Sequence, residues 1–254
     1  MSLERFVGKV AVVTGASAGI GKAAAEALVK QGLIVAGLAR RLERLNEIEL
    51  ELKNEKGKFH PFQCDLTSEH EIISSFKKIT QTLGPVHVLI NNAGVAPSGN
   101  IIDGDISKWR QIIDTNILAL CIATREAISS MQANNIKGHI IHVNSVAGHE
   151  PLDIPSGLSI YGASKYAVTA LTESLRREIN RNKLPIKITS LSPGYVKTEM
   201  INTVSEDVMN FYTNLSGLEV EDLADNIVYI LSTPEHVNIK ELTVVVQGDP
   251  VPEA

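Results

Sequence analysis

Seven short apolar runs, rich in Val and Ile, alternate with longer segments of helical spacing, and this alternation limits the fold more than any other feature of the chain. The runs span residues 10–14, 33–39, 59–64, 86–90, 139–144, 186–191 and 242–246. Uninterrupted apolar runs are typical of strands buried on both faces, and strand–helix alternation favours a parallel sheet with right-handed crossovers. The sequence therefore predicts a single α/β domain over 1–254, with a doubly wound, seven-stranded parallel sheet and helices on both faces.

Helices are expected between and after these strands. Good helix formers and capping residues place them at 21–31, 41–56, 68–83, 107–134, 161–181 and 220–231. Segment 197–217 differs, because it is polar and weakly periodic. It follows the sixth strand, where a sheet of this kind places a loop over its ligand crevice. We expect it to be a substrate lid.

Charge and cysteine content argue against several classes of protein. The 254 residues carry 24 Lys plus Arg and 29 Asp plus Glu, a net charge of -5 without a basic run, so neither nucleic acid nor a polybasic membrane patch is indicated. The apolar run 33–39 is far shorter than the roughly 18 residues of a membrane span. Two cysteines, Cys64 and Cys121, and no histidine pair at ligand spacing predict no disulfide framework and no metal site. We expect a protein of the reducing cytoplasm.

A glycine-rich turn follows the first strand. Residues 9–21 read KVAVVTGASAGIG, in which Gly15, Gly19 and Gly21 permit a tight turn, close approach of a ligand to the backbone, and close packing of helix on strand. The N-terminus of the following helix attracts a pyrophosphate. The spacing is not the standard G-x-G-x-x-G, so taken alone it is also compatible with a purely structural turn.

Two arginines end the second strand. Dinucleotide folds that hold a free ribose 2′-hydroxyl carry a carboxylate there, whereas this chain has Arg40 and Arg41 and no acid nearby. Guanidinium groups can pair with a 2′-phosphate, which favours NADP(H) over NAD(H). The alternative is that both arginines are solvated residues opening a charged helix.

Tyr161 is the only tyrosine with a lysine four residues later, Lys165, on one face of a predicted helix. An ammonium about 4 to 5 Å from the phenol oxygen would lower its pKa by roughly two units and make it a plausible acid/base. Alone, such a pair is usually a surface feature. Ser145 ends the fifth strand at the ligand edge, and Asn116 lies inside a predicted helix, which is unfavourable for Asn unless it has a polar role.

These features together resemble the classical short-chain dehydrogenase/reductase family. They occur in its order along nearly the whole chain: TGASAGIG at 14–21, Asp65, NNAG at 91–94, Asn116, Ser145, YGASK at 161–165 and Pro193–Gly194. The resemblance implies a Rossmann fold and a catalytic tetrad of Asn116, Ser145, Tyr161 and Lys165. The residues expected near the cofactor are Gly15, Ser17, Gly19, Ile20, Gly21, Arg40, Arg41, Asp65, Leu66, Asn92, Ala93, Gly94, Tyr161, Lys165, Pro193, Gly194, Val196 and Thr198.

Residues 166–173 and 229–242 are similar to the family's dehydrogenase/reductase member 11 and farnesol-dehydrogenase-like group. That group implies NADP(H) chemistry on steroid ketones or prenyl alcohols, and a homodimer or homotetramer. The final strand, however, lacks the family's glycine-rich ending, and the loop 149–159 is enlarged. The apolar residues expected around the substrate are Val95, His149, Leu152, Tyr195, Met200, Ile201, Phe211 and Tyr212; Phe211 and Tyr212 could equally be core. The alternatives are a 3-oxoacyl thioester reductase and a non-catalytic NADP(H)-binding scaffold.

Overall fold

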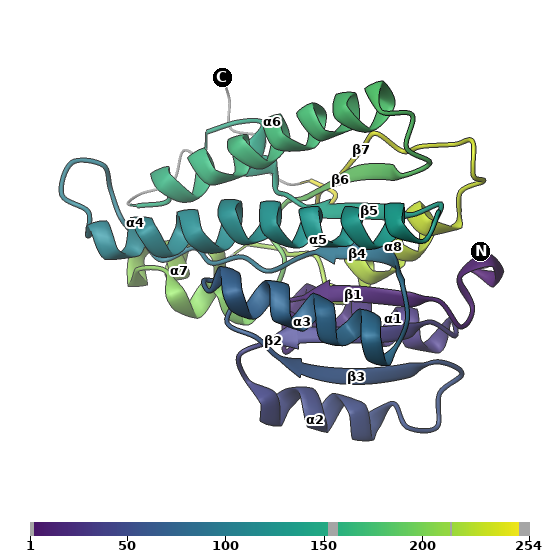
Figure 1. Ribbon diagram of the computed structural model, residues 1–254. Helices are drawn as coiled ribbons and strands as arrows, with labels where there is room; N and C mark the ends of the chain where they lie inside the picture. Colours follow the sequence, from purple (N-terminus) through teal and green to yellow (C-terminus); the bar gives the residue numbers. More distant parts are fainter. Residues whose placement is uncertain (1–2, 152–156, 214, 249–254) are drawn as a thin grey trace.

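One parallel sheet organises the molecule. The computed structural model describes residues 3–151, 157–213 and 215–248 (Figure 1). Its strands are β1 (Val10–Thr14), β2 (Ile34–Ala39), β3 (Lys58–Gln63), β4 (Val86–Asn91), β5 (His139–Val143), β6 (Lys187–Pro193) and β7 (Glu241–Val244). All pair in parallel, in the order β3-β2-β1-β4-β5-β6-β7. The predicted seven-stranded parallel sheet is confirmed.

Helices cover both faces of this sheet, as predicted. They are α1 (Gly19–Lys30), α2 (Leu42–Glu51), α3 (Glu69–Thr82), α4 (Ile106–Ile113), α5 (Ala119–Ala133), α6 (Ser159–Arg181), α7 (Glu206–Thr213) and α8 (Val220–Ser232). One apolar core joins α1, α2 and α8 to the sheet, and a second joins α3, α5 and α6 to its other side (Figure 1). Strand β1, with the sequence VAVVT, is buried at every position, which is why its apolar run is uninterrupted rather than alternating.

The long helix expected at 107–134 is interrupted. It divides into α4, a π-helical turn (Asp114–Leu118) and α5. A π-turn adds a residue to the helical repeat and commonly occurs at functional sites. It includes Asn116, whose side chain points inward with 2% exposure. Asn is a poor former of regular α-helix, and the structure shows that Asn116 lies in a π-turn with a buried side chain instead.

Segment 197–217 is more ordered than the expected loop. It holds a short 3-10 helix, η4 (Glu199–Thr203), followed by α7. Two backbone hydrogen bonds close the base of this segment: Lys197 N donates to Leu218 O at 3.0 Å, and Leu218 N donates to Tyr195 O at 2.9 Å. Hereafter the name lid denotes residues 197–217, and its role in covering a substrate stays a prediction.

The sheet order reverses between β1 and β4. From β1 the chain passes to β2 and β3 on one side, and it returns through α3 to β4 on the other. The loops after β1 and β4 therefore diverge, and ligands of open α/β sheets bind in the crevice between them. In the described part of the chain, no helix combines the length and apolar character required to cross a bilayer.

Candidate active site

A large pocket, about 670 Å³, opens at this reversal point along the carboxyl edge of the sheet. Nearly all residues predicted from the sequence line it: Gly15, Ser17, Gly19, Ile20, Arg40, Arg41, Asp65, Leu66, Asn92, Ala93, Gly94, Ser145, Tyr161, Lys165, Pro193, Gly194, Val196 and Thr198. Gly21 and Asn116 lie behind its wall. The strand ends thus bring together residues that are far apart in the sequence.

The glycine turn after β1 is shaped by steric limits. Gly15 and Gly19 have φ values of +67° and +54°, a region that side chains disfavour. At Gly21 an added Cβ would come within 2.4 Å of both the Asn92 Nδ2 and the Gly15 carbonyl oxygen. Gly21 therefore acts through packing, by allowing α1 to approach β4.

Thr14 connects the ends of β1 and β4. Its Oγ1 accepts hydrogen bonds from the backbone N–H groups of Asn92 and Ala93 at 3.0 and 3.1 Å. The Asn92 Nδ2 returns a bond to the Thr14 carbonyl at 3.0 Å. Sequence reasoning did not assign this threonine a role, although a polar residue that ends a buried apolar strand was a visible signal. Thr14 and Asn92 together fix the two edges of the crevice.

The N-terminus of α1 is open towards the pocket. Its N-cap residue, Ala18, makes no side-chain capping bond, and its first turn carries no acidic residue. The first amides of a helix need acceptors, and together with the helix dipole they favour an anion. With Gly19 allowing close approach, this end of the pocket has the features of a diphosphate site.

Charged residues line the pocket beyond α1. Arg41 Nε and Nη2 donate to the Ser17 hydroxyl at 3.2 and 3.1 Å, and Arg41 Nη1 donates to Glu199 at 2.9 Å. On the other wall, the Asp65 carboxylate accepts from the Thr67 N–H and hydroxyl at 2.9 and 2.8 Å. The backbone bond from Thr67 is the main cause that lowers the pKa of Asp65, with the Arg40 charge a smaller one. Asp65 is therefore anionic at neutral pH.

Lys165 and Tyr161 lie on the first turns of α6, as the i, i+4 spacing predicted. Lys165 is 6% exposed; its Nζ donates to the Val143 carbonyl at 2.9 Å and lies 5.7 Å from the Tyr161 ring centroid. Burial lowers the pKa of Lys165 to about 8. Burial also raises the pKa of Tyr161 above its usual value, and a hydrogen bond with the Ser145 side chain partly opposes this. The predicted lowering of the Tyr161 pKa by Lys165 is absent, since desolvation of the phenol outweighs it.

Asn116 holds the pocket wall in place. Its Oδ1 accepts from the Val95 N–H at 2.9 Å, and its Nδ2 donates to the Val95 carbonyl and to the Ser164 hydroxyl, both at 3.0 Å. Ser164 in turn donates to the Tyr161 carbonyl at 2.6 Å. The side chain of Asn116 thus ties the loop after β4 to the first turn of α6. Ser164, the serine of the YGASK pentad, was missing from the predicted site.

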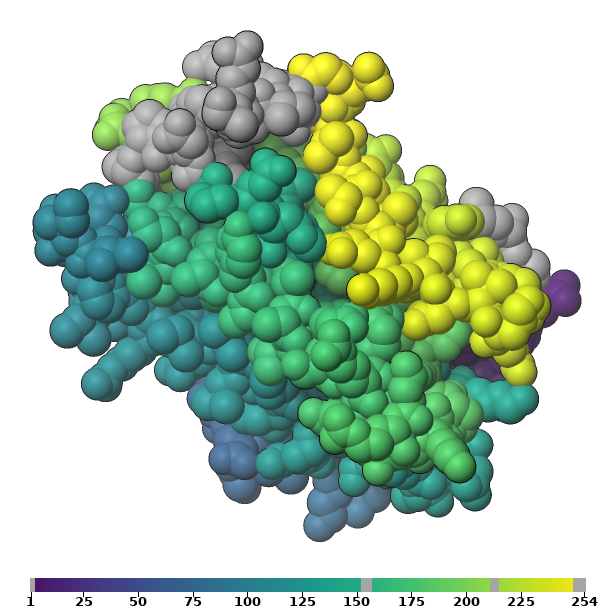
Figure 2. Space-filling model, turned by 90° about the horizontal axis from the view of Figure 1, so that it is seen from above, coloured from purple at the N-terminus to yellow at the C-terminus, as the bar shows by residue number. Residues whose placement is uncertain are grey.

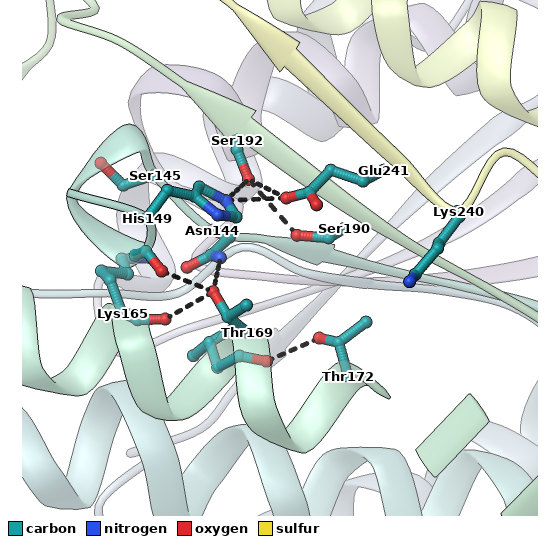
Figure 3. Close-up of polar contacts among 12 residues, drawn as sticks. Asn144, Ser145, His149, Lys165, Thr169, Thr172, Ser190, Ser192, Lys240 and Glu241 are labelled. Carbon is teal, nitrogen blue, oxygen red and sulfur yellow. Dashed lines mark hydrogen bonds and ion pairs between the residues drawn. The ribbon is translucent and has the colours of Figure 1, made fainter. Parts of the chain in front are cut away.

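His149 does not line the pocket, contrary to the sequence-based expectation. Its Nε2 lies 2.7 Å from Glu241 Oε1 and 3.1 Å from Ser192 Oγ, and the Ser192 hydroxyl donates to the same carboxylate oxygen at 3.1 Å. Figure 3 shows the imidazole pointing away from Ser145 and towards the ends of β6 and β7. The physical reason is the buried Ser192 and the Glu241 carboxylate, which offer polar partners that an apolar pocket lacks. His149 instead anchors the segment after Ser145.

Apolar residues line the end of the pocket next to Tyr161. Of the residues predicted there, Val95, Tyr195, Met200 and Ile201 line the pocket. Ala96, Leu158 and Val208 form a small apolar cluster, against which Tyr161, Met200 and Val204 pack. Leu152 and the side chains of Phe211 and Tyr212 lie outside the described residues. The cluster joins α7 of the lid to the residue before α6, so the lid packs against the Tyr161 end of the pocket.

Comparisons with known proteins agree with this architecture. Residues 9–209 match the family model described as short chain dehydrogenase. Farnesol dehydrogenase of Aedes aegypti is 41% identical over 249 residues, covering 97% of this chain and 99% of that protein. Dehydrogenase/reductase SDR family member 11 of Homo sapiens is 41% identical over 247 residues, covering 94% and 95%.

The fold has close counterparts among solved structures. The closed form of serine dehydrogenase complexed with NADP+ superposes with a TM-score of 0.84 at 29% identity, covering 92% of this chain and 94% of the other. The family model alone matches most of the chain, and the full-length relatives exceed 40% identity. The chain is therefore an oxidoreductase that belongs to the short-chain dehydrogenase family.

Proposed function

We propose that this protein is an NADP(H)-dependent oxidoreductase that interconverts the carbonyl and alcohol forms of an apolar substrate, such as a steroid ketone or a prenyl alcohol like farnesol. The observation that carries the proposal is the arrangement of one pocket. Tyr161, Ser145 and Lys165 lie at its apolar end, and the open N-terminus of α1 and the Arg41 guanidinium lie along the rest of it.

The described residues fit NADP(H). The uncapped first turn of α1 matches a pyrophosphate, and Arg41 beside Ser17 provides charge-assisted donors for a 2′-phosphate. The residues that directly follow β2, Arg40 and Arg41, are basic, whereas a carboxylate at these positions would repel that phosphate. The related serine dehydrogenase was solved with NADP+. When bound, the cofactor would supply or accept the hydride.

Tyr161 and Ser145 would act on the substrate oxygen. Because burial raises the pKa of Tyr161, the phenol keeps its proton at neutral pH and can donate it to a carbonyl oxygen during reduction. The Ser145 hydroxyl, hydrogen-bonded to the phenol, would donate a second bond and stabilise the developing negative charge. Lys165, held by the Val143 carbonyl, places a positive charge beneath the Tyr161 ring and stabilises the phenolate that remains after proton transfer.

An apolar substrate is supported by the composition of the pocket end that the lid covers. Val95, Ala96, Leu158, Met200 and Val204 contribute no charge there. Exclusion of water by such residues strengthens the polar contacts made by Tyr161 and Ser145. The 41% identical relative from Aedes aegypti is a farnesol dehydrogenase, which supports a prenyl alcohol as one candidate.

A carrier-bound thioester substrate is not favoured. An acidic carrier would need unpaired basic groups around the pocket mouth, but Lys197, at the base of the lid, is paired with Glu219. The lid also carries the acidic residues Glu206 and Asp207. The electrostatics therefore favour a small, uncharged substrate that enters on its own.

The proposal is tested by turnover with NADPH of three substrates: a steroid ketone, a prenyl aldehyde and an acyl thioester. We expect reduction of at least one of the first two. Tyr161→Phe should abolish nearly all turnover while leaving the NADPH dissociation constant within several-fold, because it deletes the proton donor and little else. Tyr229→Phe, an exposed position on α8, is the matched control. Retention of more than about a tenth of kcat by Tyr161→Phe would contradict the assignment.

A further inference from the structure

We propose that Glu199 is a built-in competitor for the 2′-phosphate site, so that binding of a 2′-phosphate releases the first turn of the lid. This inference rests on the proposed NADP(H) function and adds a specificity-determining residue to it. Glu199 is the first residue of η4 and belongs to the lid. Of the two arginines that it pairs with, Arg41 lines the pocket, and Arg44 lies one turn further on, in α2.

The carboxylate of Glu199 is shared between two guanidinium groups. Its Oε2 accepts from Arg41 Nη1 at 2.9 Å, and its Oε1 accepts from Arg44 Nη1 at 2.6 Å. Arg41 reaches back to Ser17 in the glycine turn at the same time. Arg41 and Arg44 therefore form a donor pair around one anion, with Arg41 also held by the Ser17 hydroxyl, and in this structure that anion is Glu199.

The negative charge of Glu199 makes it compete with a phosphate for the two arginines. The hydrogen bonds from Arg41 and Arg44 lower the pKa of Glu199, so the carboxylate is ionised at neutral pH. A phosphate bound to the same guanidinium groups would meet this negative charge at short range, which is unfavourable. The two anions cannot both be fully paired, and a phosphate offers more acceptor oxygens with a larger charge.

The pairing is weak enough to exchange. The side chains of Arg41, Arg44 and Glu199 are 45%, 42% and 51% exposed, and ion pairs with this exposure contribute little to stability. Glu199 therefore lowers the affinity for a 2′-phosphate without blocking it. Its removal should favour ligands that carry this phosphate and leave those without it unchanged.

The backbone connects this exchange to the lid. Directly after Glu199, Met200 and Ile201 line the pocket, and Met200 packs against the apolar cluster that contains Val208. The base of the lid is held independently, because Lys197 N donates to Leu218 O and Leu218 N donates to Tyr195 O. Release of Glu199 should therefore loosen η4 and leave the base intact. By reciprocity, a lid held by Glu199 and a bound 2′-phosphate disfavour each other.

Binding of two fragments, 2′,5′-ADP and 5′-AMP, tests the competition without turnover. Each exposed ion pair corresponds to a factor of about 2 to 5 in affinity, so Glu199→Gln should tighten 2′,5′-ADP by roughly 5- to 20-fold in calorimetry and change 5′-AMP by less than about twofold. Glu206→Gln removes the same charge from an exposed position of the lid and should bind both fragments like the parent. If Glu199→Gln binds 2′,5′-ADP no tighter than the parent, Glu199 is not a competitor.

Hydrogen exchange tests the release of the lid. In the parent protein, saturating 2′,5′-ADP should accelerate exchange at the amides of 200–204, and saturating 5′-AMP should not. Unchanged or slower exchange there with 2′,5′-ADP would overturn the coupling. The same measurements distinguish a failure of the proposed NADP(H) preference from a failure of the competition. If the NADP(H) preference is wrong, the parent protein binds 2′,5′-ADP no better than 5′-AMP.

Discussion

Replacement of Lys165 by methionine should remove activity and at the same time stabilise the fold. Most substitutions of buried residues destabilise a protein, so this expected gain is unusual. The side chain is 6% exposed, and its Nζ has one hydrogen-bond acceptor, the Val143 carbonyl, among the contacts described. Burial without a carboxylate partner disfavours the charged ammonium and lowers its pKa from 10.5 to about 8. Methionine has a similar length and shape and carries no charge.

The magnitude follows from linkage. At about 1.4 kcal/mol per pKa unit, charged Lys165 costs the folded state about 3 kcal/mol at pH 7. Methionine removes this cost but also loses the hydrogen bond to Val143, which lowers the free energy of unfolding by about 1 kcal/mol. Lys165→Met should therefore be about 2 kcal/mol more stable at pH 7, which corresponds to a Tm increase of about 4 to 8 °C for a chain of this length.

The pH dependence separates this cause from ordinary repacking. Because the folded pKa lies below the unfolded one, the cost is complete below about pH 8 and disappears as the pH rises towards 10.5. At pH 9.5 the advantage of the variant should have fallen by about 2 kcal/mol. Urea unfolding of the parent and of Lys165→Met at both pH values, without cofactor, measures it, and Lys77→Met, at an exposed position of α3, is the control. A variant that is no more stable at pH 7, or an advantage that persists at pH 9.5, would refute the reasoning.

Two further predictions concern the substrate oxygen and the subunit contacts. Ser145→Ala should lower kcat/KM by roughly 100-fold through loss of one donor to the developing oxyanion, and unchanged steady-state kinetics would show that this hydroxyl does not face the carbonyl. The expected homodimer or homotetramer needs an apolar contact face, and two large apolar side chains are exposed near one helix junction: Ile113 at the end of α4 is 47% exposed, and Leu118 at the end of the π-turn is 51% exposed. Leu118→Glu should shift sedimentation towards smaller species, whereas an unchanged profile would place the contact elsewhere.

The sheet was predictable because its signal is local. The runs around Val10–Thr14 and His139–Val143 are buried at every position, so hydrophobicity alone located them to within a residue or two. Pocket residues that follow such strands, including Asn92 and Ser145, were predictable for the same reason. Once the strands are parallel, their carboxyl ends must share one edge.

Other parts of the site depend on contacts that no local pattern encodes. Glu199 meets Arg41 across 158 residues of sequence, and the π-turn that places Asn116 depends on its bonds to Val95. His149 was predicted to line the pocket as the first residue of the enlarged loop 149–159, yet its imidazole pairs with Glu241 on the last strand. In each case a polar side chain pairs with a group that is distant in sequence. Tertiary packing determines which groups lie within hydrogen-bonding distance, so the local sequence does not reveal the partner.

The pKa of Tyr161 shows why charge arithmetic from a sequence can give the wrong sign. The i, i+4 spacing correctly placed Lys165 near the phenol, but the same burial that brings them together disfavours both charged forms. Burial raises the pKa of the phenol and lowers that of the ammonium, so two values that are close in water move apart. At neutral pH the pair then consists of a protonated phenol and a cation that the fold holds at a cost. This state suits donation of a proton to a carbonyl, since the phenolate left behind would regain a favourable interaction with Lys165. If Tyr161 donates the proton as proposed, the same burial that makes Lys165 destabilising assists the reaction, as expected from the general trade-off between stability and function at catalytic sites.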